Sequence, residues 1–352
     1  MTDNANAADN LLGRVLENGW RVVEKIPKLD GATGSFFSVC YKVVRDRETC
    51  FLKAFDFAKF FQIAEPGKKI VDVMADMLGA FKYEKYLSDF CKGHHVTKVL
   101  FVKEAGEETI EGFTIPIVPY LIFDLADGDV RKNLLFSEKL DITWRLRSLH
   151  DIAVGLKQLH LIEVSHQDLK PSNILLFKGE SKLGDMGRSV CRTISGPYDA
   201  LAFAGDYNYA PPEIMYGYYL PDWHRRVFAT DCYLLGSMVV FYFLGISMSA
   251  LLSKYLPPEF RYDIWRGRFD DVKPYIINAF SEAVDEFSGA LSAQQSGEAL
   301  RWIVERLCYP IPEERGHPKD LAAIGNPYNL ERFISKFNLL HKKAKYGLLS
   351  NG

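Results

Sequence analysis

Four polar residues with catalytic chemistry lie close together near the middle of the chain, within VSHQDLKPSNILL (164–176) and shortly after it. Asp168 is followed two residues later by Lys170 and five residues later by Asn173, and Asp185 begins a short Asp-Met-Gly turn. Two carboxylates and an amide offer the oxygen ligands that magnesium prefers, and magnesium bridges phosphates. The same loop can place a carboxylate beside a hydroxyl and an ammonium beside a phosphate, so these residues suit phosphoryl transfer.

A lysine in an apolar strand supplies a fifth polar group. Lys53 stands among Phe51, Leu52 and Phe55, where a cation is costly to bury unless an anion receives it. The glycine-bearing segment GATGSFFSV (31–39) precedes it, and exposed backbone amides of such a segment can hold a phosphate chain. By itself this segment is also compatible with a plain hairpin turn.

The elements that must position these groups change character along the chain. Loose alternation of apolar and polar residues predicts strands at 19–30, 38–45, 50–57, 99–103 and 113–123. The polar AGEETIEG (105–112) is the predicted connection between the last two. A helix from about Val71 to Phe90 carries Glu84 near its apolar side. After an abrupt change from apolar to polar residues at 121–128, the apolar residues recur at helical spacing. Asp141 or Thr143 begins the long helix that this spacing predicts. A mostly sheet part and a mostly helical part would enclose a cleft suited to a nucleotide.

Composition limits the class of protein. The chain has 352 residues, 48% of them hydrophobic, and 43 basic against 45 acidic residues, so no nucleic-acid partner is predicted. Its six cysteines are widely spaced, which argues against a zinc site or a disulfide framework and predicts a reducing, cytoplasmic location. The polar first ten residues do not fit a signal peptide and predict a disordered tail. His150, His160 and the pair His94-His95 are expected at the surface or at helix caps, and His166 in the core.

One uncharged run, from Cys232 to Ser253, is long enough to span a bilayer. Its glycines and serines dilute the hydrophobicity, and no basic cluster flanks it. We therefore predict a buried core helix and no membrane span.

The motifs together resemble those of the protein kinases over roughly residues 20–322. The stretch at 166–173 resembles the catalytic loop of that family, with Gln167 in place of its usual arginine, and Asp185-Met186-Gly187 resembles Asp-Phe-Gly. Further likenesses follow in the family's order: the Ala-Pro-Glu that closes the activation segment, ending here at Glu213; the Asp-x-Trp-x-x-Gly of the central helix, at Asp231 to Gly236; and the arginine that pairs with the glutamate, here Arg315.

The resemblance implies an α+β fold with two lobes, the smaller rich in strands and the larger helical. It implies a flexible tail at 1–18, the small lobe at 19–126, the large lobe at 127–328 and a basic helical tail at 329–352. It also implies ATP and Mg²⁺ as cofactors. By the resemblance, Gly31 and Gly34 belong to the glycine-rich loop, and the backbone groups of Asp124 and Ala126 bind the adenine, with Phe123 as gatekeeper. Lys53 binds the α- and β-phosphates and pairs with Glu84, while Asn173 and Asp185 bind magnesium. Asp168 lies at the acceptor hydroxyl and Lys170 at the γ-phosphate.

Three functions are compatible with these motifs. Lys170, Glu213, Asp231 and Arg315 favour a protein kinase with serine/threonine substrates over a small-molecule kinase of the aminoglycoside or choline kinase type. A pseudokinase, which keeps the fold as a binding module, is favoured by Phe37 at the third glycine position and by Phe51 where the family has alanine. The survival of Lys53 and the four central residues argues for an active enzyme. The oligomeric state is left open.

Two departures bear on control and specificity. Gln167 is neutral and cannot neutralise a phosphate dianion as the family's arginine does. We therefore expect activity that does not depend on phosphorylation of the activation segment, where Ser189, Thr193, Ser195 and Tyr198 are the candidate acceptors. Asp206 stands where serine/threonine kinases carry a threonine.

Overall fold

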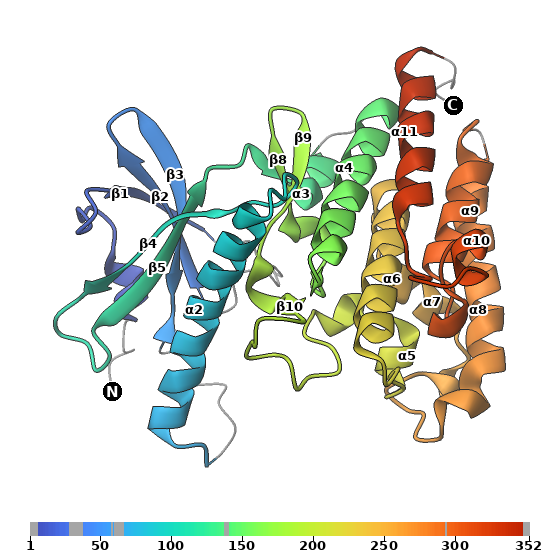
Figure 1. The fold of residues 1–352 in the computed structure, drawn as a ribbon, viewed down its shortest axis with the longest axis horizontal. Helices are drawn as coiled ribbons and strands as arrows, with labels where there is room; N and C mark the ends of the chain where they lie inside the picture. Colours follow the sequence, from blue (N-terminus) through green and yellow to red (C-terminus); the bar gives the residue numbers. More distant parts are fainter. Residues whose placement is uncertain are drawn as a thin grey trace.

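The computed structural model describes residues 6–27, 38–57, 59, 67–136, 141–292 and 294–347. Figure 1 shows a strand-rich lobe followed by a larger helical lobe, which confirms the predicted fold class. The connection after the last strand of the sheet, at Asp124, leads from one lobe to the other.

The small lobe is built on one antiparallel sheet of five strands, in the order β1-β2-β3-β5-β4. The bounds of the strands are β1 Arg21–Ile26, β2 Ser38–Arg45, β3 Glu48–Phe55, β4 Val102–Thr109 and β5 Ile117–Asp124. Helix α2 (Ile70–Gly93) lies beside the sheet (Figure 1), and its Val73 and Met77 join Phe55 and Leu121 in one apolar cluster. The sequence prediction of this helix is confirmed, with ends that extend slightly beyond the predicted ones.

The fourth strand is not where the sequence predicted it. We expected a strand at 99–103 and a polar loop at 105–112, but β4 runs through most of that loop. β4 pairs with a single neighbour, β5, at the edge of the sheet, and most of its side chains are partly or fully exposed. An edge strand accommodates polar side chains, so polarity was a poor guide here.

The segment before β1 is also different from the prediction. Residues 6–18 belong to the predicted flexible tail, yet Leu11 and Leu16 are buried with Trp20 against the sheet. The hydroxyl of Tyr41 donates a hydrogen bond of 2.7 Å to the carbonyl oxygen of Ala8. The few apolar residues of this polar segment cover the sheet face opposite α2, which the sequence alone did not reveal.

Helices form most of the large lobe. They are α3 (Val130–Phe136), α4 (Ile142–Leu161), α5 (Pro212–Met215), α6 (Trp223–Leu244), α7 (Met248–Tyr255), α8 (Phe269–Ala290), α9 (Gly297–Leu307), α10 (Pro318–Leu321) and α11 (Glu331–Lys345). Asp141 caps α4 by accepting from the amide of Thr143, as predicted. Short strands carry the catalytic segments: β6 (Gly128–Asp129), β7 (Val164–Ser165), β8 (Ile174–Phe177), β9 (Glu180–Leu183) and β10 (Val190–Cys191).

The predicted basic tail contains a helix that packs into the lobe. α11 lies alongside α4 (Figure 1) and buries Phe333, Phe337 and Leu340. Three of its lysines, Lys342, Lys343 and Lys345, lie in its last turn, while its apolar stripe is part of the large-lobe core.

The uncharged run at 232–253 forms two helices. α6 ends at Gly245, whose φ of 76° closes the helix in the left-handed conformation, and α7 continues after a short turn. α6 is long and apolar enough to cross a membrane, but 83% of its most apolar stretch is buried inside the protein. This agrees with the predicted core helix.

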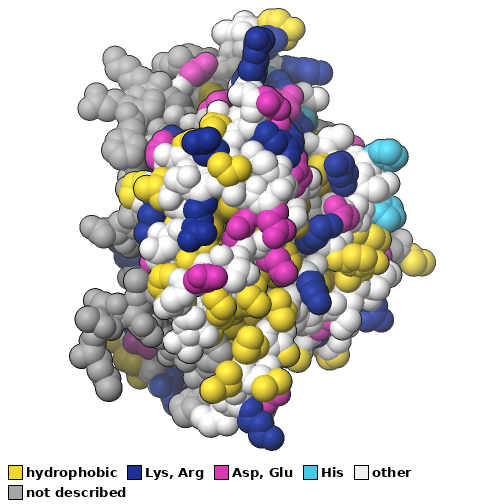
Figure 2. Space-filling view, turned by 90° about the vertical axis from the view of Figure 1, so that its left-hand side faces the viewer, with side chains coloured by type: hydrophobic (Ala, Val, Ile, Leu, Met, Phe, Trp, Pro, Cys, Tyr) yellow, Lys and Arg dark blue, Asp and Glu magenta, His cyan; other side chains and the backbone are white. Residues whose placement is uncertain are grey.

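Figure 2 views the molecule from the small-lobe side. Basic and acidic side chains are interspersed there with apolar ones, and neither sign dominates this face. The ion pair Lys42–Glu24 links the neighbouring strands β2 and β1, and Arg45–Glu104 joins the more distant strands β2 and β4.

Candidate active site

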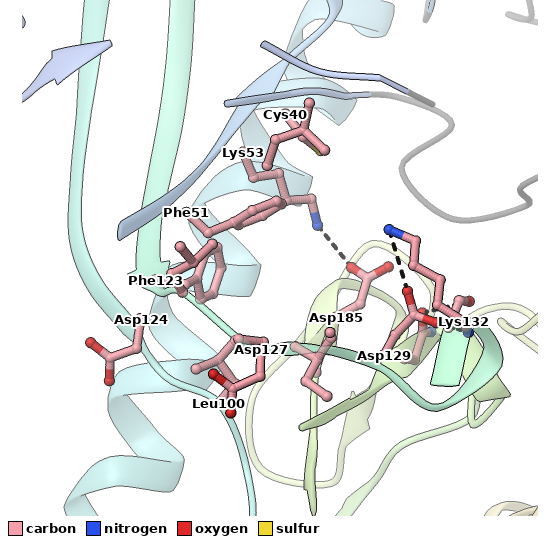
Figure 3. A pocket seen from close by; sticks show the side chains of 18 of the residues that line it. Cys40, Phe51, Lys53, Leu100, Phe123, Asp124, Asp127, Asp129, Lys132 and Asp185 are labelled. Carbon is pink, nitrogen blue, oxygen red and sulfur yellow. Dashed lines mark hydrogen bonds and ion pairs between the residues drawn. The ribbon is translucent and has the colours of Figure 1, made fainter. Parts of the chain in front are cut away.

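A cleft of about 460 Å³ opens between the two lobes. Its lining includes Lys53 from β3 and Asp185, both labelled in Figure 3, together with Glu84 from α2 and Asn173 from the catalytic loop. These four residues, spread over more than 130 positions of the chain, thus meet in one cavity, as the sequence predicted for a nucleotide site.

Lys53 lies between two carboxylates. Its Nζ donates to both oxygens of Glu84, at 3.0 and 2.9 Å, and to Oδ1 of Asp185 at 2.8 Å. Strand alternation places Phe51, Lys53 and Phe55 on one side of β3, so the lysine leaves the sheet toward α2 and the cleft. The predicted contact between Lys53 and Glu84 is present.

Charge coupling in this cluster is strong. Burial by itself lowers the pKa of Lys53, but the carboxylates of Asp185 and Glu84 outweigh it, so that pKa is raised overall. Burial raises the pKa of Glu84 more than Lys53 lowers it. Burial also acts to raise the pKa of Asp185, but Lys53 lowers it to about 2. Asp185 therefore stays ionised at neutral pH, as a metal ligand must.

The catalytic loop holds its polar groups in a compact ring. The amide nitrogen of Asn173 donates to the backbone oxygen of Asp168 at 2.8 Å and to its Oδ2 at 3.1 Å. Nζ of Lys170 lies 3.2 Å from Oδ2 of Asp168 and 3.4 Å from Oδ2 of Asp206, whose own amide donates to Oδ1 of Asp168. Burial raises the pKa of Asp168, with Lys170 opposing. Because the nitrogen of Asn173 is used by Asp168, its amide oxygen remains suited to a cation.

A buried aspartate fixes the catalytic loop to α6. Asp231 accepts from the hydroxyl of Ser165 and from the backbone amides of His166 and Gln167, at 2.8 to 2.9 Å. Nε2 of His160 lies 2.9 Å from the same carboxylate. His160 is buried, so its predicted place at the surface or a cap is wrong: the polar partner that makes its burial favourable comes from another helix. His166 lies in the core as predicted.

Of the residues predicted to contact the nucleotide base and phosphates, some are described by the structure and some are not. Gly31 and Gly34 lie outside the described residues. Asp124 and Ala126 line the cleft. The side chain of Asp124 is exposed and lies near Lys103, which leaves its backbone as the part available to a base.

The cleft has lining residues that the sequence analysis missed. Asp127, Asp129, Arg131 and Lys132 also line the cleft. Lys132 pairs with Asp129 at 3.8 Å (Figure 3). The signal available was the sudden run of charged residues directly after the apolar 121–123.

Two aromatic rings form one wall of the cavity. Phe51 and Phe123 are paired across β3 and β5, with ring centroids 6.3 Å apart (Figure 3). The family has a small alanine at the position of Phe51, so the larger side chain here fills more of the cavity than the resemblance alone implies. A planar base entering the cleft would meet an aromatic surface, which favours stacking.

Far from the cleft, the predicted pair of Glu213 and Arg315 is present. The guanidinium makes two parallel hydrogen bonds to the carboxylate, at 2.7 and 2.8 Å, and both side chains are buried. It also donates to the backbone oxygens of Ala229 and Tyr309. The pair joins the end of the activation segment to the core of the large lobe.

Comparison with known proteins leads to the same family. The model of the protein kinase domain matches residues 109–255. The chain is similar to the mitosis inhibitor protein kinase mik1 of Schizosaccharomyces pombe, with 27% identity over 182 residues, covering 51% of this chain and 28% of that protein. It is similar to the hormonally up-regulated neu tumor-associated kinase of Mus musculus, with 27% identity over 221 residues, covering 62% of this chain and 27% of that protein.

A third similar protein is the Aurora/IPL1-related protein kinase 2 of Caenorhabditis elegans, with 32% identity over 100 residues, covering 28% of this chain and 32% of that protein. The matches thus span about a quarter to a third of these relatives. Family model, relatives, two-lobed fold and the order of the motifs agree, and together they support the assignment of the chain to the protein kinase superfamily.

Proposed function

We propose that this protein is an active kinase that transfers the γ-phosphate of ATP to serine or threonine hydroxyls of a protein substrate. The observation that carries the proposal is the joint contact of Lys53 with Glu84 and Asp185 beside the ring of Asp168, Lys170 and Asn173. Phosphoryl transfer needs alignment and neutralisation of charge more than covalent help, and this cluster offers both.

Each residue has a defined part in the proposed reaction. Lys53, positioned by Glu84, would hold the α- and β-phosphates. Asp185 and the amide oxygen of Asn173 would hold Mg²⁺, which supplies neutralisation of the phosphate charge when bound. Asp168 would orient the acceptor hydroxyl and receive its proton, and its buried carboxylate lies beside Lys170, which would face the γ-phosphate.

The proposed setting of the reaction follows from the same residues. Cys50, Cys91, Cys191, Cys232 and Cys308 are buried and form no disulfide, which supports the proposal of a reducing, cytoplasmic location. Lys170 beside Asp168 supports serine/threonine substrates through the resemblance.

A direct assay tests the proposal. Purified protein is incubated with labelled ATP and magnesium, with and without a generic acceptor protein, and labelled amino acids are identified after hydrolysis. We expect label on serine or threonine, and a loss of at least about 100-fold in Asp168→Asn, because the group that orients the acceptor is removed.

One observation favours a second candidate, a binding module without catalysis. Phe51 thickens the wall where the base would lie. For such a module we expect no transfer by the native protein and no difference between it and Asp168→Asn. A shift in melting temperature on adding ATP would then separate a nucleotide-binding module from one that binds no nucleotide.

We expect the activity to be independent of phosphorylation in the activation segment. Nε2 of Gln167 donates to Ser165 and to the backbone oxygen of Val227, so the side chain is turned into the core and away from the segment. Arg188 instead ties the start of the segment to its end by donating to the backbone oxygen of Ala204 at 2.7 Å. Of the four candidate acceptors, Ser189 is fully buried in this conformation.

The measurement is the initial rate of phosphatase-treated protein whose segment is shown by mass spectrometry to be bare. A rate close to that of the untreated protein is expected. A large loss that autophosphorylation restores would overturn this prediction.

A further inference from the structure

Helix α2 belongs to two hydrophobic cores. Its first half contributes Val73 and Met77 to the cluster beneath the sheet, while its second half contributes Leu87 and Cys91 to the core of the large lobe. Glu84 lies where the two halves meet. The position of this glutamate is therefore set by contacts to both lobes.

Tyr83, directly before Glu84, makes a polar contact to the large lobe. Its hydroxyl donates a buried hydrogen bond of 2.9 Å to the backbone oxygen of Ser189, and the tyrosine is only 5% exposed. Gly196 lies against the ring, since a Cβ at that position would be 2.6 Å from two ring carbons. Two separate parts of the activation segment thus hold the same side chain.

Ser189 continues this connection into the catalytic loop. Its hydroxyl donates to the backbone oxygen of His166 at 3.3 Å, two residues before Asp168. On the other side, Gly187 lies against Glu84, where a Cβ would be 2.9 Å from Oε2. The path from α2 through Tyr83 and Ser189 to the catalytic loop is therefore continuous and buried.

We propose that Tyr83 is a positioning residue that couples the conformation of the activation segment to the Lys53–Glu84 pair. The inference rests on the proposed kinase function and names the control of that same site. When residues 187–196 lie as in this structure, Tyr83 keeps Glu84 facing Lys53, and neither a phosphate nor a partner protein is needed to hold α2. When the segment leaves this position, α2 loses its polar anchor.

Tyr83→Phe tests the coupling because it removes one hydroxyl and keeps the ring. The matched control is Tyr86→Phe on the same helix, whose side chain is 61% exposed. Loss of one buried hydrogen bond should lower kcat about fivefold, with the KM for ATP changed less than about twofold. The reason is that Lys53 keeps its charge, but Glu84 holds it in its present position for a smaller fraction of the time. Gly196→Ala, which pushes on the same ring from the other side, should act in the same direction.

Two further readouts separate positioning from general stability. Amide hydrogen exchange in 83–92 and 187–192 should become faster in Tyr83→Phe and remain unchanged in Tyr86→Phe. In a Glu84→Gln background, adding Tyr83→Phe should cost little more activity, since the tyrosine acts through the glutamate. Equal rates and exchange in the Tyr83 and Tyr86 variants, or fully additive losses in the double variant, would overturn the inference.

Failure of the proposed function would look different. If the native protein transfers no phosphate, the kinase proposal fails, and hydrogen exchange alone decides the coupling. Unchanged exchange in Tyr83→Phe would then overturn the inference as well.

Discussion

Replacing Lys53 by methionine or Asp185 by asparagine is expected to lower phosphotransfer by at least about 100-fold. Lys53 is the cation at the centre of the cleft, with three carboxylate oxygens within 3.0 Å. Without it, the α- and β-phosphates of the proposed reaction would lose the protein cation assigned to them. Without the charge of Asp185, the proposed magnesium site keeps only the amide of Asn173.

Both variants should remain folded, for a reason visible in the cluster. Removing Lys53 leaves Glu84 buried without its cation, but burial already raises the pKa of this carboxyl. Glu84 can therefore take up a proton and avoid most of the cost of an unpaired buried charge. Asp185→Asn removes a negative charge and keeps the shape of the side chain.

The measurements are transfer rates and thermal unfolding followed by circular dichroism. Lys53→Arg keeps the positive charge with a different geometry, and should also lose most of the activity. Lys25→Met, which removes an exposed lysine of β1 paired with Asp9, is the control for lysine loss. A near-native rate in either cleft variant would show that the role assigned to that residue is wrong.

Glu213→Ala is expected to destabilise the protein strongly. It would leave Arg315, which is fully buried, without its carboxylate. Breaking a buried pair in this way costs about 3–5 kcal/mol. Arginine cannot lose its proton to escape this cost, in contrast to Glu84. The remaining bonds to the backbone oxygens of Ala229 and Tyr309 do not neutralise the charge.

The readout is the melting temperature, which should fall on the order of 10 °C. Asp89→Ala is the matched control, since Lys85 and Asp89 form an exposed pair, with 45% and 51% of their side chains accessible. Exposed pairs contribute about 1 kcal/mol or less, so this variant should melt close to the native protein. An equal shift in both variants would contradict a special role for the buried pair.

The sequence by itself determined the catalytic constellation and the general architecture. Asp168, Lys170 and Asn173 are close in sequence, so one loop brings them together whatever surrounds it. The cost of burying Lys53 indicated an anionic partner, and the resemblance to the kinases assigned Glu84 to that role, a contact that the structure confirms. Periods of about two and 3.6 distinguished the sheet from the helical lobe, because side-chain direction along a strand or helix is set locally.

Only the tertiary structure decided which polar groups are buried and which way they point. His160 is favourable in the core because the carboxylate of Asp231, 71 positions later, accepts a hydrogen bond from its ring. The side chain of Gln167 turns toward α6 because the backbone oxygen of Val227 on that helix and the hydroxyl of Ser165 on β7 accept its hydrogen bonds. The polar residues of β4 can form a strand because β4 lies at the edge of the sheet. The hydrogen bond from Tyr83 to Ser189 joins residues 106 positions apart. Burial and hydrogen bonding between residues so far apart in sequence depend on how the whole chain packs, which a local sequence pattern does not determine.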